Sequence, residues 1–152
     1  MILEYTQILY TALHVNGGTD TIESSAPICS STGKRGYKKH AAKHPSVLWA
    51  SAALPHYLWL CRMALCLCDE YQFRFGATKK HACKEHIVWL QNNVPIGLLA
   101  KLLWLGDPTP AMPDEYKDPE SIIASYWAYY RGAKQDQGLF KWTGRQPPHV
   151  FC

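Results

Sequence analysis

The fold is decided by a stretch that begins Leu54-Pro55-His56-Tyr57-Leu58-Trp59-Leu60 and ends Asp69-Glu70-Tyr71-Gln72-Phe73-Arg74-Phe75-Gly76. Proline is favoured in the first turn of a helix, and glycine is a typical residue just after the last turn. Between them, residues recur at the helical period and form two neighbouring faces. One face carries Tyr57, Cys61, Ala64, Cys68, Tyr71 and Phe75, and the other carries His56, Leu60, Met63, Leu67, Glu70 and Arg74. The pattern predicts a long helix over residues 54–75 that is apolar on most sides and is the most buried helix of the fold.

Helical patterns also flank this stretch, and no segment alternates as strands do. Residues 2–14 have helical spacing without proline or glycine, and His44-Pro45 opens a short helix. Further helices are predicted through residues 81–91, capped by Thr78, and from Pro119 to about residue 133. The sequence therefore predicts an all-α fold, a single compact helical domain with long irregular loops. Those irregular segments are a basic Gly/Ser-rich loop at 16–43, a Pro-rich loop at 106–119 and a tail at 134–152.

Composition narrows the class of protein. A chain of 152 residues, 47% hydrophobic, is long enough for one domain with a real core. A net charge of +4 and many Trp and Tyr side chains are compatible with a polyanionic partner, since aromatic rings stack on bases. The cysteines form no convincing disulfide framework, and the chain shows no signal peptide and no apolar run that would span a bilayer. These features predict an intracellular protein without a membrane partner.

Several chemistries are absent or weakly signalled. The chain has no Gly-rich phosphate loop, no Gly-x-Ser-x-Gly and no His-Glu-x-x-His motif. His81, Cys83 and His86 lie close together, but they lack the paired spacing of a zinc site. Two ordinary histidines and a small apolar cysteine on a helix explain this pattern better. The sequence therefore predicts no metal and no cofactor.

Positive charge is concentrated in the run Gly33-Lys34-Arg35-Gly36-Tyr37-Lys38-Lys39-His40, which Lys43 and His44 continue. One interpretation is a solvated charged loop. The other is a phosphate-binding segment, because glycine allows close backbone approach, the cations neutralise phosphate charge and the tyrosine stacks. On this second interpretation the nucleic-acid contacts are Lys34, Arg35, Tyr37, Lys38, Lys39 and Lys43.

An acid and a base end the long helix. Glu70 and Arg74 are four residues apart and share a helical face. The plain interpretation is an ion pair of small energetic value. The alternative is a functional cleft, because a similar run recurs at Met112-Pro113-Asp114-Glu115-Tyr116-Lys117. On that alternative we expect Glu70 and Arg74 to lie near His44 or His81.

Together these segments resemble a family of small phage and viral proteins that is often labelled pyrimidine-dimer DNA glycosylase and is distantly similar to phage endonuclease V. The resemblance covers most of the chain. It implies a compact helical protein that acts on damaged or modified double-stranded DNA as a glycosylase and abasic-site lyase, in the cytoplasm or nucleus of a host cell. The residues that carry it are His44-Pro45…Trp49, Tyr57-x-Trp59-Leu60, Glu70-Tyr71-x-x-Arg74-Phe75-Gly76, His81, Met112-Pro113-Asp114-Glu115-Tyr116 and Trp142.

The resemblance also implies roles for single residues. In the glycosylases an amine attacks C1′ of the sugar and a glutamate of the first helix assists, a place that Glu4 takes here. His56, where the family usually has Asn, and Trp142 join the nucleic-acid contacts. The family's segment before the first helix is missing, so the chain is expected to be N-terminally truncated and inactive. The catalytic residues that the resemblance implies are Glu4, Glu70, Arg74, His44 and His81.

Two other functions stay open at this point. One is a nucleic-acid-binding module without catalysis, which needs only the basic loop and the aromatic residues. The other is a protein that processes a nucleotide or another small molecule. A buried cleft that gathers His, Glu, Arg and Trp favours an enzyme, whereas a basic face without such a cleft favours the binding module.

Overall fold

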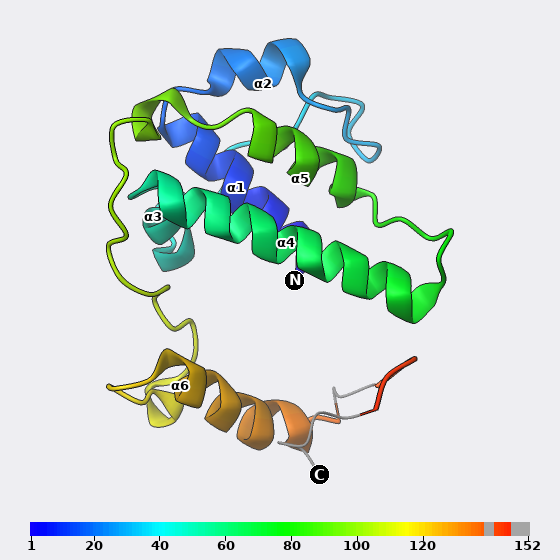
Figure 1. Cartoon of the computed structure of the whole chain (residues 1–152), viewed down its shortest axis with the longest axis vertical. Coiled ribbons are helices and arrows are strands. Elements are labelled where there is room, and N and C mark those ends of the chain that lie inside the picture. Colours follow the sequence, from blue (N-terminus) through cyan, green and yellow to red (C-terminus); the bar gives the residue numbers. More distant parts are fainter. Residues whose placement is uncertain (139–141, 147–152) are drawn as a thin grey trace. The chain divides into compact units, whose positions relative to one another are not determined.

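The computed structural model describes residues 1–138 and 142–146, and the regular elements of these residues are all helical (Figure 1). Their extended backbone pairs at one isolated bridge, between Ile28 and Arg35. The prediction of an all-α fold is confirmed. The length of the chain predicted one domain, whereas its contacts group it into two compact units, Met1–Gly106 and Asp107–Cys152.

The first unit is built around the helix α1. Its elements are α1 (Ile2–Val15), α2 (Thr19–Ser25), α3 (Pro45–Ala50), α4 (Leu54–Phe75), α5 (Cys83–Asn92) and the 3-10 turn η1 (Ile96–Leu98). Helix α1 packs against α3, α4 and α5, and α4 also packs along α5. The largest side chains of the core come from these elements: Leu9, Tyr10, Leu13, Ile22, Trp49, Tyr57, Leu60, Leu90 and Leu98.

Relative to its length, α1 is more buried than α4, so the prediction that residues 54–75 form the most buried helix is wrong. Residues 9–13 of α1 are all buried, because three helices cover this part of its surface. Helix α4 buries one face and leaves Trp59, Met63 and Phe73 exposed. Apolar side chains on most sides of a helix do not determine which of those sides another element covers.

One helix was not predicted, and another begins later than predicted. Helix α2 forms inside the segment 16–43 that was predicted to be a loop, because Ile22 is buried in the core and tertiary packing supports a sequence of modest helix propensity. Helix α5 begins at Cys83, later than a cap at Thr78 requires. The Cys83 N–H donates to Nδ1 of His81 (3.1 Å), so the histidine satisfies one of the free amides at this helix end.

The second unit contains the 3-10 turn η2 (Asp114–Tyr116), the helix α6 (Ile122–Tyr129) and a π-helical turn, Tyr130–Lys134. Helix α6 begins three residues after the predicted Pro119, where the Ser121 hydroxyl caps it by accepting from the Ala124 N–H (3.1 Å). Residues 142–146 are irregular, as predicted, and residues 139–141 and 147–152 of the predicted tail lie outside the described residues.

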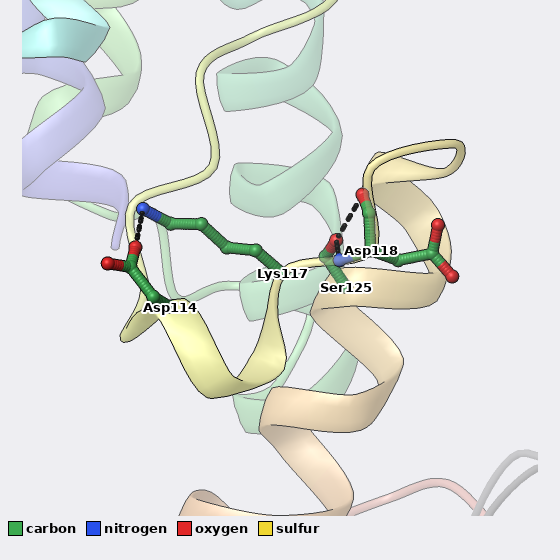
Figure 2. A network of polar contacts seen from close by, with 4 residues as sticks. All are labelled: Asp114, Lys117, Asp118 and Ser125. Atoms are coloured by element: carbon green, nitrogen blue, oxygen red, sulfur yellow. Dashed lines mark hydrogen bonds and ion pairs between the residues drawn. The ribbon is translucent and has the colours of Figure 1, made fainter.

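A polar network joins η2 to α6 (Figure 2). Lys117 Nζ forms an ion pair with Asp114 Oδ1 (2.6 Å). The Asp118 N–H donates to Oγ of the buried Ser125 (2.7 Å), and that hydroxyl lies within 3.1 Å of the Ser121 carbonyl, to which it donates. The second acidic and basic run of the sequence is therefore a structural turn that fixes the start of α6.

Among the described residues, none of the helices combines the length and the apolarity needed to cross a lipid bilayer.

Candidate nucleic-acid interface

The basic loop is held in place by its own backbone. The Cys29 N–H donates to the Lys34 carbonyl (2.8 Å), and the Gly36 N–H donates to the Pro27 carbonyl (2.9 Å). Arg35 Nη1 donates to the Ala26 carbonyl (2.7 Å), so the arginine also ties its loop to the end of α2. These bonds make an ordered turn that presents its polar residues to solvent.

The loop then lies directly against α1. Gly36 is buried with φ +61°, and a Cβ at this position would come within 2.6 Å of the Tyr10 ring. Further along, the His40 N–H donates to Thr11 Oγ1 (3.1 Å), and His14 Nε2 donates to the Tyr37 carbonyl (3.1 Å). Side chains of α1 therefore form hydrogen bonds with backbone groups of the loop. These groups are not paired in a regular β ladder, so they need such partners.

An open cleft of about 1080 Å³ lies beside this loop, and we call it the basic cleft. Its walls come from α1, α2, the loop and the residues that open α5. Of the nucleic-acid contacts predicted from sequence, Lys34, Arg35, Tyr37, Lys38 and Lys39 line it. The lining residues with charged, hydroxyl, imidazole or thiol groups are His14, Glu23, Cys29, Ser31, Thr32, Lys34, Arg35, Tyr37, Lys38, Lys39, His40, His81 and Cys83.

Tyr37 belongs to the wall of the cleft. Its ring centroid lies 5.5 Å from that of Tyr10 and 5.2 Å from that of His86, and its hydroxyl lies 3.7 Å from Cys83 Sγ. Burial raises the pKa of Tyr37 above its ordinary value, so its hydroxyl is uncharged at neutral pH. Part of the ring is covered by these neighbours, which limits the face that it offers for stacking.

Two histidines next to the cleft are neutral at pH 7. Burial lowers the pKa of His86, whose Nδ1 accepts a hydrogen bond from the Tyr10 hydroxyl (2.8 Å). Burial and then the nearby N-terminal amine lower the pKa of His81. These two histidines therefore add no positive charge to the basic cleft at neutral pH.

The buried His86 predicts that stability falls in mild acid. Its pKa is lower in the folded state than its ordinary value of 6.5, so the unfolded chain binds the proton more tightly. The contribution is fully present above that value and is lost as the pH falls from there toward the folded-state pKa. Urea unfolding at about pH 7.5 and about pH 5.5 measures the loss, which His86→Gln should reduce because it removes the titrating group. If His86→Gln loses as much stability between the two pH values as the wild type does, the acid sensitivity belongs to other groups.

The residues implied to be catalytic do not gather in the basic cleft. His81 lines it, and its ring lies edge-on to Tyr71 of α4 at 5.2 Å, but Glu4, Glu70, Arg74 and His44 are not part of the lining. Glu70 Oε1 and Arg74 Nε form an ion pair at 2.7 Å, as their spacing of four residues on one helical face allows. Glu4 is exposed and lies 3.1 Å from the Met1 amine, and His44 Nδ1 caps α3 by accepting from the Ser46 N–H (3.2 Å).

His56 was expected to contact nucleic acid, but its side chain is buried in the core. Its side chain is 0% exposed and stacks on Trp49 with ring centroids 4.3 Å apart. Nδ1 donates to the Trp49 carbonyl (2.9 Å), and Nε2 accepts from the Leu105 N–H (3.0 Å). A neutral ring with its proton on Nδ1 satisfies both partners, so His56 joins α3, α4 and the segment after η1.

The remaining predicted contacts are not among the residues that line the basic cleft. Lys43 is exposed on the segment before α3, and Trp142 is a half-buried residue of the second unit. In the described part of the chain, no group of three or more His, Cys, Asp or Glu side chains is arranged to hold a metal ion.

Sequence reasoning missed the two cysteines of the cleft. Cys29 falls in a segment that was predicted to be a loop, and Cys83 was interpreted as a small apolar cysteine of a helix in preference to a zinc ligand. Both line the basic cleft, because Tyr37 of the loop lies against the first turn of α5, with its hydroxyl 3.7 Å from Cys83 Sγ. This long-range approach leaves no periodic signal in either segment.

Comparison with known proteins found no matching family model, no matching curated protein and no matching solved structure. The resemblance to the glycosylase family therefore rests on the quoted residues, and the function is argued from the geometry of the chain.

Proposed function

We propose that this protein binds double-stranded DNA through the basic cleft. The observation that carries the proposal is that Lys34, Arg35, Lys38 and Lys39 line one open cleft. Cations that converge on one surface neutralise neighbouring phosphates and release counterions, which is the main source of affinity in sequence-independent binding. The glycines at positions 33 and 36 keep this part of the loop free of bulky side chains next to those cations.

We propose binding, rather than turnover, as the principal activity. The resemblance to the glycosylases supports damaged or modified DNA as the ligand. Against catalysis in the cleft, Glu70 is paired with Arg74, and neither residue belongs to the lining. Borohydride trapping on a duplex with an abasic site tests this choice, because efficient trapping of a Schiff base would establish a lyase and contradict a purely binding role.

The location of the interface is tested by two variants of equal charge. Lys38 and Lys39 line the cleft, whereas the exposed neighbours Lys79 and Lys80 do not. If each cleft lysine neutralises one phosphate, Lys38→Ala/Lys39→Ala flattens the plot of log affinity against log salt by about 2 and weakens binding roughly 10- to 100-fold near 0.1 M salt. Fluorescence anisotropy of a labelled duplex, titrated at several salt concentrations, measures both quantities.

The matched variant Lys79→Ala/Lys80→Ala makes the same change in net charge. We expect it to lower affinity by a few-fold at most, through the general field of the protein. Equal losses in the two variants would show that DNA responds to net charge and not to the cleft. No measurable binding by the unaltered protein would contradict the proposed function itself.

A further inference from the structure

The segment 96–105 of the first unit exposes large apolar side chains along most of its length. Leu103 is 76% exposed and Ile96 is 71% exposed. Single exposed hydrophobic residues are normal on a protein surface, whereas a contiguous group of them marks a site of interaction. We call this group the apolar patch, and its members are Trp59, Ile96, Leu99, Leu102, Leu103, Trp104 and Leu105.

The patch extends from this segment onto α4 through Trp49. The ring centroids of Trp59 and Trp104 lie 5.6 Å and 5.7 Å from that of Trp49, and both rings meet it edge-on. Two partly exposed tryptophans from distant parts of the sequence therefore lie against one buried ring. This contact makes the surface of α4 and the segment 96–105 one continuous apolar face.

The backbone of the segment is fixed to the rest of the first unit. The Leu54 N–H donates to the Lys101 carbonyl (2.9 Å), and the Leu105 N–H donates to Nε2 of His56 (3.0 Å). Backbone groups that have such partners are cheaper to bring into an apolar phase than groups bonded only to water. The segment therefore presents its apolar side chains outward on a backbone that is held at these points.

The elements that carry the patch contain cations but no carboxylate side chains. No Asp or Glu occurs in residues 24–68 or 86–106, which include α3, most of α4 and η1. Lys101 is exposed within the segment, and the exposed Arg62 follows Trp59 by about one helical turn. An apolar surface with these charges is complementary to a partner that is both apolar and anionic.

We propose that the apolar patch is a peripheral contact with a lipid bilayer that has anionic headgroups. Leu102 and Leu103 enter the boundary between headgroups and acyl chains, and Trp104 lies at the headgroup level, where tryptophan is enriched. The ammonium group of Lys101 is attracted to the anionic headgroups.

A second copy of the chain is a less suitable partner for the same face. A two-fold symmetric contact brings the same patch of both copies together, and so sets Lys101 of one copy near Lys101 of the other. The segments that carry the patch have no Asp or Glu to neutralise this pair. Charge complementarity therefore favours the anionic bilayer.

A contact of this kind needs no element that crosses the bilayer. The lack of a spanning helix among the described residues therefore does not bear on it. The prediction of no membrane partner considered only spanning runs and signal peptides. The inference also stands whether or not the basic cleft binds DNA.

Co-sedimentation of the full chain with unilamellar vesicles tests the patch. The vesicles are phosphatidylcholine, either alone or with about one third phosphatidylserine to give a negative surface potential. We expect binding to the anionic vesicles, which Leu103→Ser weakens about 10-fold because an inserted leucine contributes the free energy of burying its side chain. Ile123→Ser is the matched control, since Ile123 is 67% exposed on α6 outside the patch, and it should bind as the wild type does.

Lys101→Gln separates the electrostatic part of the binding from the apolar part. It should weaken binding to the anionic vesicles about 5-fold and leave any binding to phosphatidylcholine alone unchanged. Circular dichroism should show the same helical content in all variants, because each change is at an exposed side chain.

Three results would overturn the proposal. The first is a wild-type protein that does not sediment with the anionic vesicles. The second is equal binding by Leu103→Ser and the wild type, and a loss confined to Lys38→Ala/Lys39→Ala would then assign the headgroups to the basic cleft. The third is a dimer, seen by sedimentation equilibrium without lipid, that Leu103→Ser dissociates, because the patch would then bind a second copy of the chain.

Discussion

Gly36→Ala is expected to lower the free energy of unfolding by about 3 kcal/mol, because it combines an unfavourable backbone conformation with an overpacked core. The new Cβ would lie 2.6 Å from Tyr10 Cε1 and 2.7 Å from Ile22 Cγ2. Tyr10 has no room to retreat, since its hydroxyl is bonded to His86 and its ring stacks on Trp89. The strain therefore falls on the contact between the loop and α1.

Gly33→Ala is the matched control. Gly33 has nearly the same backbone angle, φ +66°, but no atom lies within 4 Å of its added Cβ. Gly33→Ala should therefore lower the free energy of unfolding by about 1 kcal/mol, from the left-handed backbone conformation alone. Urea denaturation of both variants measures the difference, and equal costs would show that the loop does not pack tightly against Tyr10.

His56→Ala is expected to destabilise the first unit by about 3 to 4 kcal/mol, a value typical of the removal of a large buried ring. The change deletes the stacking on Trp49 and leaves the Trp49 carbonyl and the Leu105 N–H without their present partner. Circular dichroism followed through a urea titration measures the loss.

His56→Phe separates packing from hydrogen bonding. The phenyl ring restores most of the volume and the stacking but supplies neither nitrogen, so we expect about half of the alanine cost. His40→Ala, at an exposed side chain, should stay within about 0.5 kcal/mol of the wild type. A His56→Ala variant as stable as His40→Ala would contradict the assignment of His56 to the core and return it to the candidates for ligand contact.

Local signals in the sequence predicted much of the helical content. Helix α4 has the predicted bounds, because Pro55 and Gly76 act within their own turns. The short helix at Pro45 was predicted for the same reason, with His44 at its cap. The long-range features were missed: Ile22 stabilises α2 only because it packs in the core, and the central place of α1 depends on which helices cover it.

The candidate site was predictable in its charges but not in its arrangement. One of the two interpretations of the run from Lys34 to Lys39 was a phosphate-binding segment, and the run lines the basic cleft. The positions of the histidines were harder to predict, because the tertiary structure buries His56 and His86. Nothing in the residue type separates a buried histidine from one on the surface. Whether a polar side chain contacts a ligand or packs in the core depends on neighbours that are distant in sequence. The role of the cleft in binding DNA stays a prediction.

Because the basic loop is anchored on α1, its conformation is fixed before any ligand binds. Because Gly36 packs beneath Tyr10 and Thr11 holds the His40 backbone, the loop loses its conformational entropy when the chain folds. Association then requires no coupled folding of the loop, in contrast to basic segments that become ordered on their target. We therefore expect a polyanion that binds at the basic cleft to meet a preformed surface, on which long-range electrostatic attraction can act without prior folding of the loop.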